Sequence, residues 1–333
     1  ISDNLLMKNF NKLYTWCITD GKAGNVNQAK GLAKLLGLDF KQKELSLKFP
    51  WNRLPVGILP IGKYIFKNFD EFDLSNLPKI IITCGKRSAY FSIYLKKKYP
   101  FIFNIHILNP RIDISYFDLI VAPLHDRLSG KNILSTEISI SHIDQRLINE
   151  EKLKFENDFK SESRKICTVL IGGNSRNHKF EESEAKNLAT KLNYLNKNNN
   201  YRIVVLFSRR TSNKIKKTIK NEVIQKGIVW NKNENPYVSL MGYSDFIICT
   251  SDSVSMVSES ISSSKPVFIY KLPSKKKNNR IEYFIDNVIN NNYAKLLEDK
   301  LYHFDCKYYN QNKEIKKIII NKYKNYIDKN HND

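Results

Sequence analysis

The chain has 333 residues, of which 41% are hydrophobic and 12% aromatic, and its formal net charge is +22. This length exceeds one ordinary core and predicts two domains, at residues 1–150 and 151–333. No run of about 18 apolar residues is present, which excludes a transmembrane helix, and the absence of interleaved basic and aromatic motifs argues against nucleic acid as a partner. The charge is compatible with phosphate-bearing ligands, with peripheral contact to an anionic membrane, or with a Lys- and Asn-rich surface from an AT-rich genome.

The cysteines are odd in number, form no CxxC pair and, in four of five cases, lie in apolar strand-like runs: Cys17, Cys84, Cys167, Cys249 and Cys306. This usage favours reduced, buried thiols in a cytoplasmic protein and argues against a zinc site, so neither a metal nor a cofactor is expected. The N-terminus has no signal-peptide pattern, and we interpret residues 1–6 as an extension ahead of a start at Met7.

Apolar runs alternate with amphipathic stretches along the whole chain, which is typical of parallel α/β sheets. Strands are predicted in the first half over 13–19, 43–47, 79–84, 104–108, 119–122 and 133–136. Strands are predicted in the second half over 166–171, 202–207, 227–230, 246–249 and 267–270. Each half opens with a strand, a glycine-containing loop and a helix, so we expect an α/β protein with two Rossmann-like domains facing a cleft.

Two further stretches bear on the organisation of the chain. Residues 141–164 are charged and lack a convincing strand, and we interpret them as the connection between the domains. Residues 310–329 carry Ile and Tyr at helical spacing, which predicts a long C-terminal helix that returns to the first domain.

The ends of the predicted strands in the first half carry glycines and cations. Ligands of parallel sheets bind beyond the carboxyl ends of the strands, and a cation at a helix start is unfavourable unless an anion lies there. These loops are either plain turns into helices or ligand loops, and we select the following residues as the candidate acceptor side: Asp20, Gly21, Lys22, Gly24, Asn25, Gly85, Lys86, Arg87 and Arg111.

The fifth predicted strand is followed by His125 and Asp126, which are our candidate catalytic residues. Histidine titrates near neutral pH, and a loop at a strand end would place His125 in the cleft as a general base. Asp126 is a weaker candidate for its partner, because adjacent side chains often diverge. A structural or substrate-binding role for His125 is the alternative.

Three loops in the second half suggest a pocket for a nucleoside diphosphate. Glycines permit close approach of a phosphate, paired arginines can clamp a diphosphate, and a helix that begins at a Ser-rich turn offers backbone N–H groups to an anion. A carboxylate further along that helix can reach ribose hydroxyls. The candidate binding residues are Gly172, Gly173, Asn174, Ser208, Arg209, Arg210, Ser251, Ser253, Ser255 and Glu259. Plain turns and a solvated arginine pair are the alternatives.

Two lysine runs, at residues 96–98 and 275–277, are interpreted as solvated helix or loop ends. Contact with an anionic membrane surface is the alternative for both.

Several of these segments occur in an order that resembles a known family. DGKxGNxxQ (residues 20–28), ILNPR (107–111), FDLIVxPxHD (117–126), LIGGNS (170–175), SRRT (208–211) and TSDSVSMVSES (250–260) are similar to motifs of the elongated-mitochondria fission-factor family. Its plant members act in mitochondrial fission, and many bacterial members are described as predicted nucleoside-diphosphate-sugar epimerases. The likeness spans residues 14–272.

The resemblance implies the GT-B glycosyltransferase architecture, in which the C-terminal domain holds a sugar nucleotide. On this basis Ser253 and Ser255 would contact the diphosphate and Glu259 the ribose. Related proteins have glycine where this chain has Ser264. The implied activity is transfer of a sugar from a nucleoside diphosphate to an acceptor, and the alternatives are a sugar-nucleotide epimerase and a non-catalytic adaptor.

Overall fold

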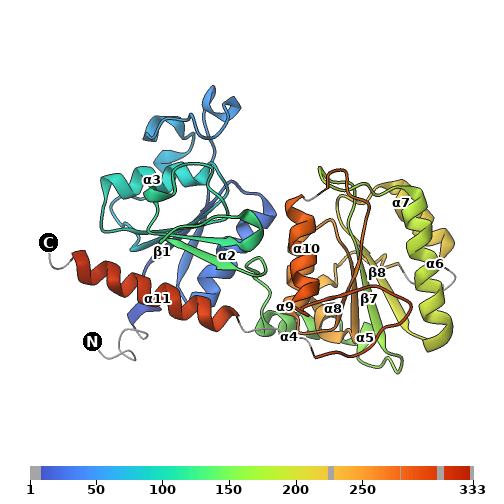
Figure 1. Cartoon of the computed structure of the whole chain (residues 1–333). Coiled ribbons are helices and arrows are strands. Elements are labelled where there is room, and N and C mark those ends of the chain that lie inside the picture. The colour runs from blue at the N-terminus through green and yellow to red at the C-terminus, as the bar shows by residue number, and fades with distance from the viewer. Residues whose placement is uncertain (1–8, 224–228, 278, 306–310, 331–333) are drawn as a thin grey trace. The chain divides into compact units, whose positions relative to one another are not determined.

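The computed structural model describes residues 9–223, 229–277, 279–305 and 311–330, and it divides the chain into two compact units (Figure 1). Unit 1 comprises residues 1–142 and 310–333, and unit 2 comprises residues 143–309. This division differs from the predicted domains 1–150 and 151–333, because the C-terminal segment belongs to the first unit.

Unit 1 is built on a six-stranded parallel sheet in the order β2-β1-β3-β4-β5-β6. Its strands are β1 (Thr15–Thr19), β2 (Phe40–Glu44), β3 (Ile80–Cys84), β4 (Phe103–Ile107), β5 (Leu119–Pro123) and β6 (Ile133–Thr136). The inner strands are buried on both faces, as continuous apolar runs require.

Alternate residues of each strand face opposite layers of helix in unit 1. Cys17 on β1 packs with α2 (Ala23–Leu36) and α11 (Gln311–Asn330), whereas its neighbour Trp16 packs with α3 (Ser88–Lys98). The two helices that are furthest apart in the sequence therefore share one face of the sheet (Figure 1).

Unit 2 is built on a five-stranded parallel sheet in the order β11-β10-β9-β7-β8. Its strands are β7 (Ile166–Ile171), β8 (Arg202–Phe207), β9 (Phe246–Thr250), β10 (Val267–Tyr270) and β11 (Lys295–Leu296). The first two strands of the unit are neighbours, and the third lies on the other side of the first.

Helices cover both faces of this sheet. The side of β9 that carries Ile248 packs on α6 (Glu182–Asn199) and α7 (Asn213–Glu222). The side that carries Cys249 faces α9 (Val254–Ser262), where the Cys249 thiol lies 3.1 Å from the Ser260 hydroxyl. The remaining helices of the unit are α4 (Gln145–Lys154), α5 (Glu156–Phe159), α8 (Tyr237–Tyr243) and α10 (Arg280–Asn290).

The α/β class, the parallel sheets and the C-terminal helix are confirmed, with four local differences. β2 begins three residues before the predicted 43–47, and β11 was not predicted. Of the predicted strand 227–230, residues 227 and 228 lie outside the described residues, and Val229 forms an isolated bridge with Val205. The supposed connection at 141–164 contains α4 and α5.

Helix α11 should be a structural part of unit 1. Ile319 is fully buried in the core that α11 shares with β1 and β3, whereas its neighbour Ile318 is partly exposed. We expect Ile319→Ala to lower the free energy of unfolding by about 2–4 kcal/mol, through lost burial and the cavity left behind. Ile318→Ala is the matched control and should cost clearly less. Equal losses in urea unfolding of the two variants would contradict this packing.

Candidate functional site

The loops at the carboxyl ends of β7 and β9 form the candidate site of unit 2. The chain leaves β7 to build β8 on one side and later builds β9 on the other side of β7. Ligands of open parallel sheets bind where the strand order reverses in this way, because the two loops diverge to opposite faces and leave a crevice. The glycines after β7 and the polar turn after β9 flank this position.

The Asp252 carboxylate joins three loops at this edge. Its Oδ2 accepts a hydrogen bond from the Gly173 N–H at 3.1 Å and lies 2.7 Å from the guanidinium of Arg210, which follows β8. Its Oδ1 accepts a hydrogen bond from the Thr250 hydroxyl at 2.6 Å. The Asp252 side chain is 0% exposed, so protein donors, and not water, stabilise its charge.

The two glycines after β7 leave space for the Asp252 carboxylate and for the backbone of Arg210. A Cβ on Gly172 would overlap the Asp252 carboxylate, and a Cβ on Gly173 would overlap the backbone carbonyl of Arg210. Groups of the protein itself therefore fill the space that the missing side chains leave. The predicted contact of these glycines with a phosphate stays a prediction.

Helix α9 begins in the same turn. The Ser253 hydroxyl caps the helix by accepting a hydrogen bond from the Met256 N–H at 3.3 Å, and the first turn holds no acidic residue. Among the described residues, the N–H groups of Val254 and Ser255 have no hydrogen-bond acceptor. Together with the helix dipole, they make this end of α9 suited to an anion.

Glu259 lies on α9 and is held by a tyrosine from α8. The Tyr237 hydroxyl donates a hydrogen bond to Glu259 Oε2 at 2.6 Å. Burial raises the pKa of Glu259, and burial together with this carboxylate raises the pKa of Tyr237 well above its usual value. The other oxygen of Glu259 has no hydrogen-bond donor within the described part of the chain, so a fixed carboxylate offers one free acceptor.

Other predicted residues of unit 2 bind their own loops. Asn174 Oδ1 accepts a hydrogen bond from the Phe180 N–H at 2.7 Å, Ser251 Oγ accepts one from the Leu272 N–H at 2.9 Å, and Ser208 Oγ accepts one from the Arg210 N–H at 3.1 Å. These bonds give Asn174, Ser208 and Ser251 a role in shaping the loops.

Arg209 and Ser255 differ from the other predicted binding residues. Both side chains are exposed, and neither makes a hydrogen bond or ion pair with the described residues. Together with the free oxygen of Glu259, they are the predicted groups that the fold leaves available to a ligand.

Sequence reasoning missed Asp252 and His178. His178 follows the glycine loop and forms an isolated bridge with Ser274, beyond β10, and its ring is buried. Burial lowers the pKa of His178, although the charge of Asp252 opposes that shift. The position of His178, five residues after the glycine pair that follows β7, is the sequence signal that could have identified it.

In unit 1, the loops after β1 and β3 meet at the corresponding reversal of strand order. Asn25 donates a hydrogen bond to Asp20 Oδ1 at 2.7 Å, and the Cys84 thiol lies 3.6 Å from Asn25 Oδ1. Gly85 has a φ of 103°, and a Cβ there would approach Asn25 Nδ2 to 2.8 Å. Hydrogen bonds from Asn25 and Lys22 outweigh burial and lower the pKa of Asp20. The predicted acceptor loops are thus neighbours.

Three predicted cations of unit 1 are exposed: Lys86 and Arg87 in the loop after β3, and Arg111 in the segment after β4. The Arg87 guanidinium donates a hydrogen bond to the Asn52 carbonyl at 2.6 Å, which ties the loop after β3 to the segment between β2 and β3. The remaining predicted residues of this side, Gly21 and Gly24, lie at the turn from β1 into α2.

His125 and Asp126 lie in a short 3-10 turn, Leu124–Asp126, after β5. His125 is only 6% exposed, because the turn directs Leu124 to solvent and the imidazole inward. Asp126 Oδ2 accepts a hydrogen bond from the Asn109 N–H at 3.2 Å and so fixes the loop after β4. A catalytic role for His125 and Asp126 stays a prediction.

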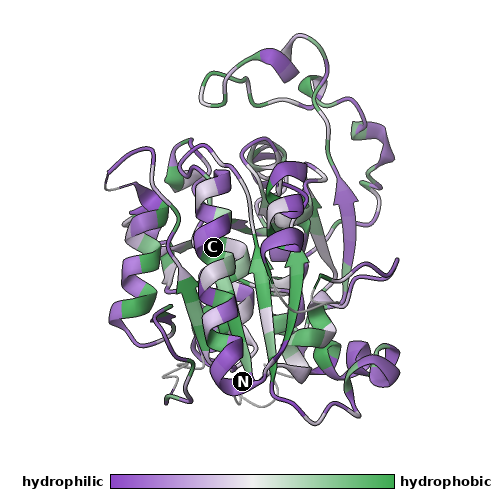
Figure 2. Ribbon diagram, turned by 90° about the vertical axis from the view of Figure 1, so that its right-hand side faces the viewer, coloured by the Kyte–Doolittle hydropathy of each residue, from purple (hydrophilic) through white to green (hydrophobic). Residues whose placement is uncertain are grey.

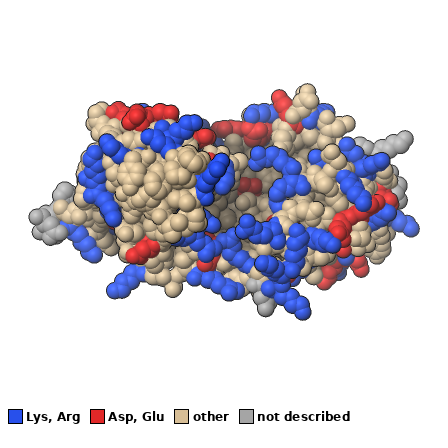
Figure 3. All heavy atoms as spheres, turned by 90° about the horizontal axis from the view of Figure 1, so that it is seen from above, with Lys and Arg blue, Asp and Glu red and all other residues tan. Residues whose placement is uncertain are grey.

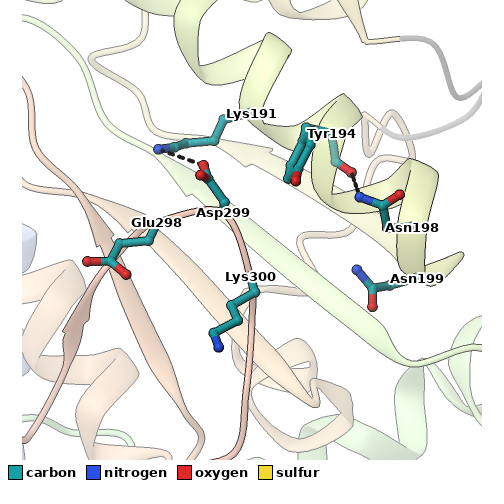
Figure 4. A pocket seen from close by; sticks show the side chains of 7 residues that line it. All are labelled: Lys191, Tyr194, Asn198, Asn199, Glu298, Asp299 and Lys300. Carbon is teal, nitrogen blue, oxygen red and sulfur yellow. Dashed lines mark hydrogen bonds and ion pairs between the residues drawn. The ribbon is translucent and has the colours of Figure 1, made fainter.

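Two hollows of unit 2 have polar linings. One, of about 560 Å³, lies between the second half of α6 and residues 298–300; Figure 4 shows Lys191 pointing toward Asp299 across it. This part of α6 leads into the start of β8, so the hollow lies toward the amino edge of the sheet. The other, of about 350 Å³, is lined by Trp230 and Asn235 among others, close in sequence to Tyr237.

The prediction that the lysines at 96–98 form a solvated helix end is wrong for Lys96. Lys96 Nζ lies 2.8 Å from Asp118 Oδ2 and 2.8 Å from the Tyr326 hydroxyl, and its side chain is 20% exposed. Lys96 of α3 therefore links α11 to Asp118, the residue before β5. In the other run, Lys275 donates to the Ser175 carbonyl at 2.8 Å and contacts the loop after β7.

Within the described residues, no group of three His, Cys, Asp or Glu side chains is arranged to hold a metal ion. The same residues include no helix that is both long enough and apolar enough to cross a membrane.

Comparison with known proteins connects this arrangement to a family. The family described as mitochondrial fission ELM1 matches residues 23–323. The chain belongs to this family. It is 28% identical over 346 residues to an uncharacterised protein of Rickettsia prowazekii, covering 91% of this chain and 97% of that protein. It is 25% identical over 220 residues to the mitochondrial fission protein ELM1 of Arabidopsis thaliana, covering 58% of this chain and 51% of that protein.

Solved structures support the GT-B-like fold of this ELM1-family chain. A UDP-GlcNAc 2-epimerase from Neisseria meningitidis, bound to UDP-GlcNAc, aligns with a TM-score of 0.52 at 14% identity, covering 92% of this chain and 91% of that one. The glycotransferase of kitacinnamycin aligns with a TM-score of 0.51 at 8% identity, covering 95% and 96%. The predicted fold class and family are confirmed.

The hydrogen bonds and the ion pair of the Asp252 carboxylate should contribute strongly to the stability of unit 2. We expect Asp252→Ala to lower the free energy of unfolding by about 2–3 kcal/mol, because it leaves the buried Gly173 N–H without an acceptor and Arg210 without its partner. Asp286→Ala breaks an exposed pair with Lys271, at 2.7 Å, and should cost less than about 0.5 kcal/mol. Similar urea midpoints for the two variants would show that Asp252 is not a structural centre.

Proposed function

We propose that this chain binds a nucleoside-diphosphate sugar in unit 2 and transfers the sugar to an acceptor held by unit 1. The proposal is carried by three groups on segments that start at the carboxyl edge of unit 2: the free N–H groups of α9, the exposed Arg209 after β8 and the fixed carboxylate of Glu259 on α9. An anion site beside a carboxylate with one free oxygen matches a diphosphate joined to a ribose. UDP-GlcNAc bound to an epimerase of the same fold supports this ligand class.

The proposed chemistry assigns a role to each group. As the bond between the anomeric carbon and the diphosphate oxygen breaks, negative charge develops on the leaving diphosphate. Arg209 and the amino end of α9 would neutralise this charge, without a metal ion in the step. Glu259 would accept a hydrogen bond from a ribose hydroxyl. His125 of unit 1 is the candidate base for the acceptor.

Two other functions are alternatives within this family. The epimerase neighbour favours conversion of the sugar on its nucleotide, and the plant relative's name favours a non-catalytic role. Incubation with UDP-GlcNAc in the absence of an acceptor distinguishes an epimerase from a transferase. An epimerase changes the sugar, which NMR detects, whereas a transferase gives at most slow hydrolysis. An Arg209→Ala variant that keeps full cellular function would favour the adaptor.

We also propose that the protein is cytoplasmic, because its described cysteines are buried free thiols. Within the described residues, Cys17, Cys84, Cys167 and Cys249 are buried free thiols. Burial raises the pKa of Cys249 to about 12, which makes it a poor nucleophile. Reduced structural thiols of this kind are usual in a reducing compartment.

Nucleotide binding should depend on Arg209 and Glu259. We expect UDP-GlcNAc to raise the melting temperature of the chain, and Arg209→Ala or Glu259→Gln to weaken binding about tenfold or more, the effect of losing a charge-assisted hydrogen bond. UDP alone and a panel of other sugar nucleotides identify the base and the sugar. Binding that disappears with EDTA would overturn the metal-free step.

The controls share the chemistry of these residues but lie on the helices α6 and α4. Glu184 on α6 also accepts a hydrogen bond from a tyrosine hydroxyl, that of Tyr270 at 3.0 Å, and Arg146 on α4 is an exposed arginine. Glu184→Gln and Arg146→Ala should bind as the unmodified chain does. If no sugar nucleotide shifts the melting temperature, or if the controls lose binding equally, the proposed site is wrong.

The raised pKa of Glu259 predicts a pH dependence. A ribose hydroxyl bonds best to the ionised carboxylate, and burial keeps this carboxyl protonated to a higher pH than an ordinary glutamate. Binding of UDP-GlcNAc should therefore weaken as the pH falls through the raised pKa. Isothermal titration across that range should show a flatter profile for Glu259→Gln. An unchanged profile in this variant would remove Glu259 from the ribose site.

A further inference from the structure

The segment between β2 and β3, residues 45–79, protrudes from unit 1. It contains the 3-10 turns Trp51–Arg53, Lys63–Ile65 and Phe69–Glu71 in place of a helix. Figure 1 shows it (blue to cyan) extending past α3, and Figure 2 shows hydrophobic and hydrophilic residues alternating along it. Its length and position are features that the proposed sugar-nucleotide site does not use.

Large apolar side chains of this segment face solvent. Phe49 is 70% exposed, Ile58 65% and Tyr64 56%, which places them among the most exposed large hydrophobic residues described. The Trp51 and Tyr64 rings lie 6.1 Å apart, and Lys48 N–H donates to the Ile65 carbonyl at 2.8 Å. The two ends of the protrusion therefore meet, and we refer to residues 48–67 as the tip.

The charge of the tip has one sign. Between Glu44 and Asp70 the sequence contains no Asp or Glu, and it contains the four cations Lys48, Arg53, Lys63 and Lys67. All four are exposed, and the Arg53 guanidinium lies over the Phe49 ring at 5.3 Å from its centroid. Figure 3, which looks down on this end of unit 1, shows an uncharged area with Lys and Arg around much of its border and acidic residues at its upper and lower margins.

The tip is also fixed in place. Ile65 and Phe66 are fully buried in the core beneath α3, and Gly57 N–H donates a hydrogen bond to the Tyr90 hydroxyl at 2.7 Å. Arg87 holds Asn52 from the side of α3. Exposed Phe49 and Ile58 are thus presented on an anchored support, and little conformational entropy remains to be lost when they are buried against a partner.

We propose that the tip docks on the interface of an anionic lipid bilayer. Aromatic rings with a polar edge favour the headgroup level, and aliphatic side chains enter the acyl boundary. Lys and Arg beside them attract anionic headgroups, which an uncharged bilayer cannot offer. The absence of carboxylates from the tip removes the repulsion that such a surface would otherwise impose.

Vesicle flotation tests this proposal with the full chain. We expect binding to vesicles of phosphatidylglycerol and phosphatidylcholine, weak binding to pure phosphatidylcholine, and lower affinity as salt is raised. The double variant Phe49→Ser/Ile58→Ser should bind the anionic vesicles about tenfold less well or worse. Tryptophan fluorescence should shift to the blue on binding, and Trp51→Phe should remove that shift.

The matched control removes equally exposed apolar side chains from unit 2. Leu153 is 72% exposed and Tyr194 51%, so Leu153→Ser/Tyr194→Ser changes hydrophobicity without changing the tip. This variant should float with the vesicles as the unmodified chain does. Both double variants should keep the urea midpoint, because the replaced side chains are exposed.

Four results would overturn the proposal. They are absence of binding to anionic vesicles, equal binding to neutral ones, an unchanged affinity of Phe49→Ser/Ile58→Ser, or an equal loss in the control. Concentration-dependent self-association that the tip variant abolishes, without vesicle binding, would assign the tip to a second copy of the chain.

Discussion

The buried carboxylate of Asp252 is the constraint on which the site edge of unit 2 depends. Removing a carboxylate from water is costly unless charged and polar donors replace the lost hydration. Here the donors come from the loops after β7, β8 and β9, so satisfying one charge fixes three chain segments. The requirement extends to Gly172, where any side chain would displace that carboxylate. Helix α9, whose N-cap Ser253 follows Asp252, begins beside these contacts.

The fold could be predicted from the sequence where an unbroken apolar run is compatible only with a buried strand. β7, β8 and β10 have the predicted bounds because strands buried on both faces appear as unbroken apolar runs. β2 is an edge strand of sequence FKQKE, and its apolar signal is weaker than that of Leu45 and Leu47 just beyond it. Those two residues begin the protruding segment and pack in the core cluster that also holds its Phe66, which bridges Leu47. Leu45 and Leu47 are apolar because they pack in the core outside the sheet, and for this reason the predicted strand, 43–47, lies three residues after the observed one.

The site could be predicted at the level of loops but not of single side chains. The order of strands and helices places the predicted polar residues of unit 2 in loops at the carboxyl edge or on the helix that starts there. The sequence does not show which side chain of a turn points inward. In Thr250-Ser251-Asp252-Ser253 the carboxylate turns toward Gly173, Ser251 binds Leu272, and Ser253 caps α9. Asp252 was missed because an acid in a polar turn is usually solvated.

The candidate acceptor loops and the tip both belong to the compact unit 1. Arg87 follows β3 beside Lys86, and its guanidinium binds Asn52 within the tip. A bilayer that holds the tip would therefore be connected through this hydrogen bond to the loop after β3. Under the two proposals together, the bilayer that holds the tip would also be the source of the acceptor for the candidate acceptor loops. The tip needs no nucleotide to bind lipid, so vesicle binding and sugar-nucleotide binding can fail independently. If the chain binds both, an amphiphilic molecule in the bilayer becomes the class of acceptor that fits both proposals.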